Sequence, residues 1–236
     1  MIKNVGVDSI LNFWFGDSAW GTRDFNSVSN FSDVSHKWFG MKDGKKLSKK
    51  EQDEIDNECK QFLPLFEQLN DPEWSDNVLS VKGLYAKMIL TDQLSRNCFR
   101  GSKRAFEYDE IALNSAKTMY VEKLVTGMGF PKKSYFGYVH FMFFLIPFQH
   151  SENLVDHVMM EDILAQLGLI VAADGSTEAV SFYQNIKFYC DQHTEVFKLF
   201  GRYPHRNKAK GRHSTPSEIK WLSDTDNLPE WAKSQM

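Results

Sequence analysis

Three groups of polar side chains interrupt apolar helical patterns, and they are the residues with which this chain could do chemistry. The first group is Asp92, Gln93, Arg96, Asn97 and Arg100. The second is His150, Ser151 and Glu152, and the third is His193, Arg202, His205, Arg206 and Asn207. Imidazoles titrate near neutral pH and can exchange protons with a substrate, whereas guanidinium groups match the geometry of phosphate and carboxylate. These residue types together suit a site that binds a small anion and moves a proton.

The first group completes the apolar face of a helix predicted over residues 81–97. Val81, Leu84 and Met88 recur at helical spacing, and the same face continues into Asp92 and Arg96. Burying a charge is costly unless the charge is paired. Either these groups satisfy one another in a buried network or they line a pocket. The simpler alternative is an i, i+4 ion pair between Asp92 and Arg96 on a partly exposed face.

Simpler interpretations also exist for the other two groups. Ser151 could cap the next helix and Glu152 could complement its dipole, which leaves only His150 unexplained. His193 lies on the apolar face of a long helix predicted over 178–200, where a single histidine is usually a hydrogen-bonded core residue. The arginines of the polar loop at 202–207 could bind the loop's own carbonyl groups.

Other kinds of site have little support. His150, His193, His205 and one carboxylate could form a metal site, but their spacing is not that of metal ligands. The first and third groups also contribute four arginines, which repel a cation. Neither a nucleophile elbow nor a glycine-rich nucleotide loop occurs, so nucleophilic catalysis and a nucleotide-binding fold have little support. We therefore expect no metal and no cofactor. Three widely spaced cysteines imply no disulfide framework and favour a reducing, cytoplasmic compartment.

Composition narrows the class of protein further. The 236 residues are 42% hydrophobic and 14% aromatic, which is typical of a globular chain. A net charge of −3 gives no general attraction to nucleic acid or to an anionic membrane. The most apolar run, Tyr135–Phe148, is too short to span a bilayer, which takes roughly 20 residues. It predicts a buried helix that Pro147 ends or kinks, and the N-terminus lacks the apolar region of a secretory signal.

The whole chain is expected to be helical, because no segment longer than four residues alternates with period two. Capping boxes at Ser48–Glu51 and Thr215–Glu218 begin two of the helices, and Gly201 ends another. The interval from Gly168 to Ser176 predicts a break. The fold class is therefore all-α, with about seven to nine helices in a single domain over 1–236. Residues 223–236 are expected to form a loosely held tail.

Several motifs resemble the DUF924 family of uncharacterised proteins over nearly the whole chain. They are TDQLSRNCFRGSKRAFEYDEIAL at 91–113, LIPFQHSE at 145–152 and FGRYPHRNKAKGRHSTPSEIKWL at 200–222, with ILNFWFGD and KWFGMKD near the N-terminus. Leu94-Ser95 stands where the family usually has Phe-Pro, and Gln149 where it often has Glu. The resemblance implies an all-α fold similar to tetratricopeptide-repeat helix hairpins, and it supplies no established reaction.

Two functions are compatible with these features. In the first, the three groups meet in a pocket for a small phosphorylated or carboxylated molecule. His150, Asp92, Glu152 and His205 would then be the acid–base residues, and the ligand would be held by Gln93, Arg96, Asn97, Arg100, Ser151, His193, Arg202, Arg206 and Asn207. In the second, the protein is an interaction module whose hairpins present a groove to a peptide or protein, and the polar groups are internal struts.

Overall fold

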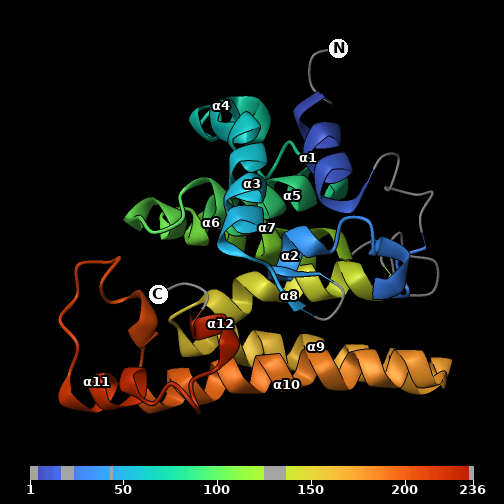
Figure 1. The fold of residues 1–236 in the computed structure, drawn as a ribbon. Coiled ribbons are helices and arrows are strands. Elements are labelled where there is room, and N and C mark those ends of the chain that lie inside the picture. The colour runs from blue at the N-terminus through green and yellow to red at the C-terminus, as the bar shows by residue number, and fades with distance from the viewer. Residues whose placement is uncertain (1–4, 17–23, 43–44, 125–136, 234–236) are drawn as a thin grey trace. The chain divides into compact units, whose positions relative to one another are not determined.

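The computed structural model describes residues 5–16, 24–42, 45–124 and 137–233 (Figure 1). Helices dominate these ranges, and the sheet within them is a two-stranded hairpin of β1 (Met41–Lys42) and β2 (Lys45–Lys46). The all-α prediction is therefore confirmed. The chain divides into two compact units. Unit 1 is Met1–Cys98 with Tyr108–Pro147, and unit 2 is Phe99–Glu107 with Phe148–Met236. The stacking of helices as tetratricopeptide-like hairpins stays a prediction.

Unit 1 is a set of mostly short helices. They are α1 (Val5–Phe15), η1 (Val28–Phe31), α2 (His36–Phe39), α3 (Lys49–Cys59), η2 (Lys60–Phe62), α4 (Leu63–Glu67), η3 (Pro72–Trp74), α5 (Val81–Met88), η4 (Ile89–Leu94), α6 (Ser95–Cys98), α7 (Asp109–Thr118) and η6 (Met119–Leu124). The capping box predicted at Ser48 and Glu51 is confirmed at the start of α3. Large aromatic side chains fill the core, with Phe15 in contact with the rings of Trp38, Tyr85 and Phe143.

The helix predicted over 81–97 is interrupted by a π-helical turn, η4, between α5 and α6. The hydroxyl of Thr91 donates to the Lys87 carbonyl at 2.7 Å, and that of Ser95 donates to the Thr91 carbonyl at 2.7 Å. Side-chain hydroxyls that bond carbonyls four residues earlier compete with the regular backbone ladder. The wider turn accommodates this competition, and π-turns of this kind often occur at functional sites.

Pro147 does not end its helix, which corrects one of the two effects predicted for it. Helix α8 (Tyr138–His150) continues through the proline for three more residues. A proline inside a helix costs about 3 kcal/mol, because it removes a hydrogen bond and crowds the preceding turn. Leu145 and Phe148 on either side are fully buried, so their packing offsets this cost.

Unit 2 is organised by two long helices, α9 (Leu154–Asp174) and α10 (Thr177–Phe200). The break predicted between Gly168 and Ser176 is confirmed at the end of that interval: α9 continues through Gly168 to Asp174, and Gly175, with φ +69°, ends it. A Cβ on Gly168 would lie 3.0 Å from the Tyr183 hydroxyl. This glycine therefore allows α9 and α10 to approach closely. Gly201 ends α10 in the left-handed conformation, as predicted.

Shorter elements complete unit 2. They are η5 (Lys103–Phe106), η7 (Pro204–Arg206), α11 (Pro216–Ser223) and α12 (Glu230–Lys233). The predicted capping box at Thr215 is present, but the residue that α11 buries is Glu218, while Ile219 is 56% exposed. In the C-terminal segment, Leu228 and Ala232 are buried. Within the described ranges, no helix is both long and apolar enough to cross a bilayer.

Candidate functional site

Asp92 and Arg96 form a buried charged network within unit 1. Their residues are only 1% and 9% exposed, so a pair on an exposed face is excluded. The Nη2 atom of Arg96 lies 3.6 Å from Asp92 Oδ1 and only 2.6 Å from Asp109 Oδ1. Gln93 donates to Asp92 Oδ2 at 2.6 Å. Asp109 was not identified from the sequence as a partner of Arg96, because an acidic residue opening a helix looks like an ordinary dipole complement.

The other members of the first group lie apart from this network. Asn97 is buried in unit 1. Arg100 is exposed and belongs to unit 2.

Three histidines and two aromatic side chains form a cluster inside unit 2, which we call the imidazole cluster: His150, His193, His205, Tyr203 and Trp231. The His193 ring lies 6.2 Å from the His150 ring and stacks on the Trp231 indole at 3.9 Å. The His205 ring lies 5.7 Å from Tyr203 and 5.3 Å from Trp231. The end of α8, the middle of α10, η7 and α12 thus contribute to one cluster.

Arg206 brings a buried positive charge to the imidazole cluster. The residue is 1% exposed, and its Nη1 donates to the His150 carbonyl at 2.9 Å. Its guanidinium lies 4.9 Å from the Tyr203 ring and 5.1 Å from the Phe106 ring. Aromatic faces attract a guanidinium electrostatically. They also hold its plane in place.

His193 is neutral and its tautomer follows from its hydrogen bond. Nδ1 lies 2.7 Å from the Tyr189 carbonyl, which can only accept, so Nδ1 carries the proton. The lone pair of the ring is then on Nε2. Burial, followed by the positive potential of His150, lowers the pKa of His193 to about 3. At neutral pH its imidazole is therefore an uncharged acceptor, which is the state that a general base requires.

Glu152 is tied to the backbone of the cluster. Its carboxylate accepts a forked pair of bonds from Arg212 at 2.6 and 2.9 Å and a third bond from the Tyr203 amide at 2.8 Å. Burial would raise the pKa of Glu152, but the bonds from Arg212 and Tyr203 outweigh it and lower the pKa overall. The carboxylate stays ionised and holds Tyr203 in place.

Ser151 does not cap α9, which corrects the simpler interpretation of the second group. The cap is Asn153, whose side chain accepts from the Val155 amide at 3.0 Å. The Ser151 hydroxyl donates instead to Asp156 at 2.6 Å. The Ser151 carbonyl lies 2.9 Å from Nε2 of His157, a buried histidine whose other nitrogen lies 2.9 Å from the Thr194 hydroxyl. His157 therefore has a structural role.

Arg202 and Asn207 are held by Glu218. Arg202 donates to both carboxylate oxygens, at 2.6 and 2.8 Å, and Asn207 donates at 3.3 Å. These bonds and the one from the Thr215 amide lower the pKa of Glu218 to about 2. Arg202 also donates to the His213 carbonyl and Arg206 to the His150 carbonyl, each at 2.9 Å, so the carbonyl groups that these arginines bind lie outside the 202–207 loop.

The sequence analysis missed several residues of unit 2 that shape the cluster: Tyr203, Arg212, Glu218 and Trp231. Tyr203 lies inside the R-x-x-H-R-N motif, and its hydroxyl donates to the Gln149 carbonyl. Arg212 and Glu218 were visible only as part of a basic loop and a capping box. No group of three or more His, Cys, Asp or Glu side chains placed to hold a metal ion occurs in the described part of the chain.

Fold and site together define an all-helical protein with imidazole and guanidinium groups gathered in its C-terminal unit. The model of the family described as "Bacterial protein of unknown function (DUF924)" matches residues 10–226, and the chain belongs to that family. A solved structure titled "Structure of Protein of Unknown Function ATU0120 from Agrobacterium tumefaciens" is similar, with a TM-score of 0.52 and 21% identity. The match covers 92% of this chain and 97% of that one, and at this identity it shows the fold alone. No functionally curated protein matches.

Proposed function

We propose that unit 2 binds a small molecule through a phosphate or carboxylate group. The observation that supports this is the buried guanidinium of Arg206 beside the three imidazoles of the cluster. Residues 202–213 contain five Lys and Arg residues and no Asp or Glu. The carboxylates of Glu152 and Glu218 bind Arg212 and Arg202, and Glu152 also lies 3.8 Å from Lys210.

Arg206 is the residue best suited to hold the anion. A guanidinium forms two parallel hydrogen bonds with a phosphate or carboxylate group. Its burial strengthens such bonds, because charges interact more strongly where the effective dielectric constant is low. His205 and His150 would flank the anion.

His193 adds a requirement on the ligand. Its neutral Nε2 can only accept, so the group facing it must donate a hydrogen bond. A hydroxyl group or a protonated phosphate oxygen meets this requirement, and its proton can pass to Nε2 during a reaction. We therefore propose a hydroxylated or phosphorylated small acid as the ligand, with His193, His150 and His205 as acid–base candidates.

The other residues of the predicted site receive supporting roles in this proposal. Glu152 fixes Tyr203 and Arg212, while Arg202 and Asn207 fix the start of α11 through Glu218. Asp92, Gln93, Arg96 and Asn97 belong to unit 1, where their contacts stabilise helices. The proposed binding residues are thus confined to unit 2.

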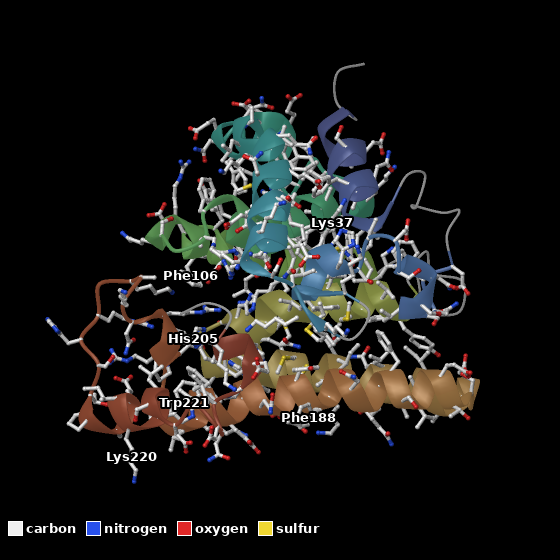
Figure 2. The ribbon with its side chains drawn as sticks, in the orientation of Figure 1. Lys37, Phe106, Phe188, His205, Lys220 and Trp221 are labelled. Carbon is white, nitrogen blue, oxygen red and sulfur yellow. The ribbon has the colours of Figure 1, made fainter. Side chains whose placement is uncertain are left out.

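Thermal unfolding with phosphate, citrate and nucleotides, each compared with chloride at equal ionic strength, tests the proposal. A ligand present at about a hundred times its Kd stabilises the native state by about 2.7 kcal/mol, which raises Tm by several degrees. Arg206→Lys keeps the positive charge but cannot form two parallel hydrogen bonds with the anion, so we expect it to reduce the ligand-induced rise in Tm by more than half. Arg206→Ala should abolish that rise. Lys220→Ala, at an exposed lysine of α11 labelled in Figure 2, should keep the full shift. No shift beyond that of chloride in the wild type would contradict the proposal.

A further inference from the structure

One face of α9 carries an apolar stripe that is open to solvent. It consists of Val155, Val158, Asp162, Ala165, Leu169 and Ala172, which follow one another at intervals of 3, 4, 3, 4 and 3 residues. Val155, Val158 and Leu169 are 66%, 50% and 75% exposed, and the other three residues are exposed as well. This alternation of 3 and 4 is the heptad spacing of helices that pack against another helix. We call these six residues the α9 stripe.

The α9 stripe is distinct from the face of α9 that builds the core of unit 2. That inner face contains Met160, Ile163, Leu164 and Leu167, all 5% exposed or less. A helix that is apolar on both faces is normally buried on both. An exposed apolar face on such a helix is unusual and indicates an interaction surface.

The charges of α9 decide which kind of partner fits. Its ionisable residues other than the buried His157 are Asp156, Glu161, Asp162 and Asp174, and it contains no Lys or Arg. Asp162 lies within the stripe, whereas the neighbouring Glu161 already pairs with Lys198 of α10 at 4.0 Å. A cation at the matching position of a partner would satisfy the Asp162 carboxylate, because opposite charges across a helix pair set partner choice and orientation.

The same charges disfavour two other occupants. Asp162 and Ala165 lie at the middle of the α9 stripe, so a second copy of α9 in either orientation would bring acidic residues together. Like charges across such a seam are destabilising. An anionic membrane would repel the helix, since helices that lie on membranes carry Lys and Arg on their polar face.

We infer that the α9 stripe docks an amphipathic helix of a partner protein, with apolar residues at heptad spacing and a Lys or Arg facing Asp162. The affinity comes from burying the valine and leucine side chains of the stripe, and the charge pair fixes the register. This surface does not involve the imidazole cluster, so it is independent of the proposed anion site.

Two synthetic helical peptides of about three heptads test the inference with the full chain. Both peptides carry Leu at the other a and d positions. At the position facing Asp162 and at the flanking e and g positions, the first peptide has Lys and the second has Glu. Fluorescence anisotropy at low salt should show the Lys peptide binding at least about tenfold more tightly than the Glu peptide, since salt would screen the difference.

Exposed residues provide the variants, so folding is preserved and circular dichroism can check it. Leu169→Glu should abolish binding of the Lys peptide, whereas Leu199→Glu, at a 67% exposed leucine of α10, should leave it unchanged. Asp162→Lys should weaken the Lys peptide about tenfold and strengthen the Glu peptide, because the charge pair is reversed.

Five outcomes would overturn the inference. Three concern the peptides: failure of both to bind, equal affinity for both, and an effect of Leu199→Glu as large as that of Leu169→Glu. The fourth is a dimer of the full chain in sedimentation that Leu169→Glu dissociates, which would assign the stripe to a second copy. The fifth is binding to vesicles containing phosphatidylglycerol that Leu169→Glu removes, which would assign the stripe to a membrane.

Discussion

Replacing Arg96 by methionine is expected to lower the free energy of unfolding by about 3–5 kcal/mol, the cost of breaking a buried ion pair from one side. Methionine nearly preserves the volume of the side chain but removes the cation. The carboxylates of Asp92 and Asp109, whose side chains are 2% and 17% exposed, would then repel each other across the vacated guanidinium site. Urea unfolding at pH 7 measures the loss as a lower midpoint at unchanged slope.

The matched control for this experiment is Lys187→Met. Lys187 pairs with Asp191 at 2.6 Å, the distance that separates Arg96 from Asp109, but both partners are about half exposed. An exposed pair contributes about 0–1 kcal/mol. Equal losses in the two variants would contradict the view that burial decides the effect. Arg96→Met combined with Asp109→Asn should recover part of the loss, because the second change removes the stranded charge.

Helical periodicity favoured the burial of Asp92 and Arg96 but left an ion pair on a partly exposed face open. It gave no indication of Asp109, which lies 2.6 Å from Arg96. Asp109 lies 13 positions further along, at the start of another helix, and its contact with Arg96 depends on how α7 packs. Partner choice is a tertiary property, and no local pattern encodes it.

Helix ends that depend on local capping were predicted from the sequence, whereas those that depend on tertiary packing were not. The capping boxes at Ser48 and Thr215 and the terminating Gly201 were predicted correctly, because each device acts within one turn of the chain. Pro147 does not end its helix, and the break predicted between Gly168 and Ser176 falls at Gly175 rather than at Gly168. At Pro147 and Gly168 packing outweighs local preference: large buried side chains flank Pro147, and Tyr183 lies directly over Gly168.

At the candidate site, the sequence predicted the candidate residues but not the contacts between them. His150, His193 and His205 stood out because polar residues interrupt apolar patterns, and all three do lie in one cluster of unit 2. The contacts that hold this cluster together, such as Arg212 with Glu152 across 60 positions, carry no sequence signal that one chain reveals. The sequence therefore indicated which histidines are candidates for a site, but not which residues contact one another.

The wild-type protein is expected to lose stability as the pH falls below 6.5, in part because the buried His193 imidazole stays neutral in the folded state. The folded-state pKa of about 3 lies below the unfolded value of about 6.5. Between these values the unfolded chain binds the proton and the folded chain does not, so protons favour unfolding. The contribution of His193 is fully present above pH 6.5 and falls by about 1.4 kcal/mol per pH unit below it. At pH 5 this amounts to about 2 kcal/mol.

His193→Asn isolates this contribution. The asparagine amide can donate to the Tyr189 carbonyl in place of Nδ1, and it does not titrate. Urea unfolding at pH 7.5, 6 and 5 should therefore show a shallower decline in the variant than in the wild type, by about 2 kcal/mol at pH 5. His140 and His157, whose pKa values burial also lowers, are present in both proteins and cancel in the difference.

His213→Asn is the matched control, because His213 is exposed and the chemical change is the same. It should reproduce the pH dependence of the wild type. If the free energies of unfolding of His193→Asn and the wild type instead decline in parallel from pH 7.5 to 5, then folding does not lower the pKa of His193. The imidazole at the centre of the cluster would then be a cation in mild acid, and its assignment as a neutral acceptor for a ligand hydroxyl would be wrong.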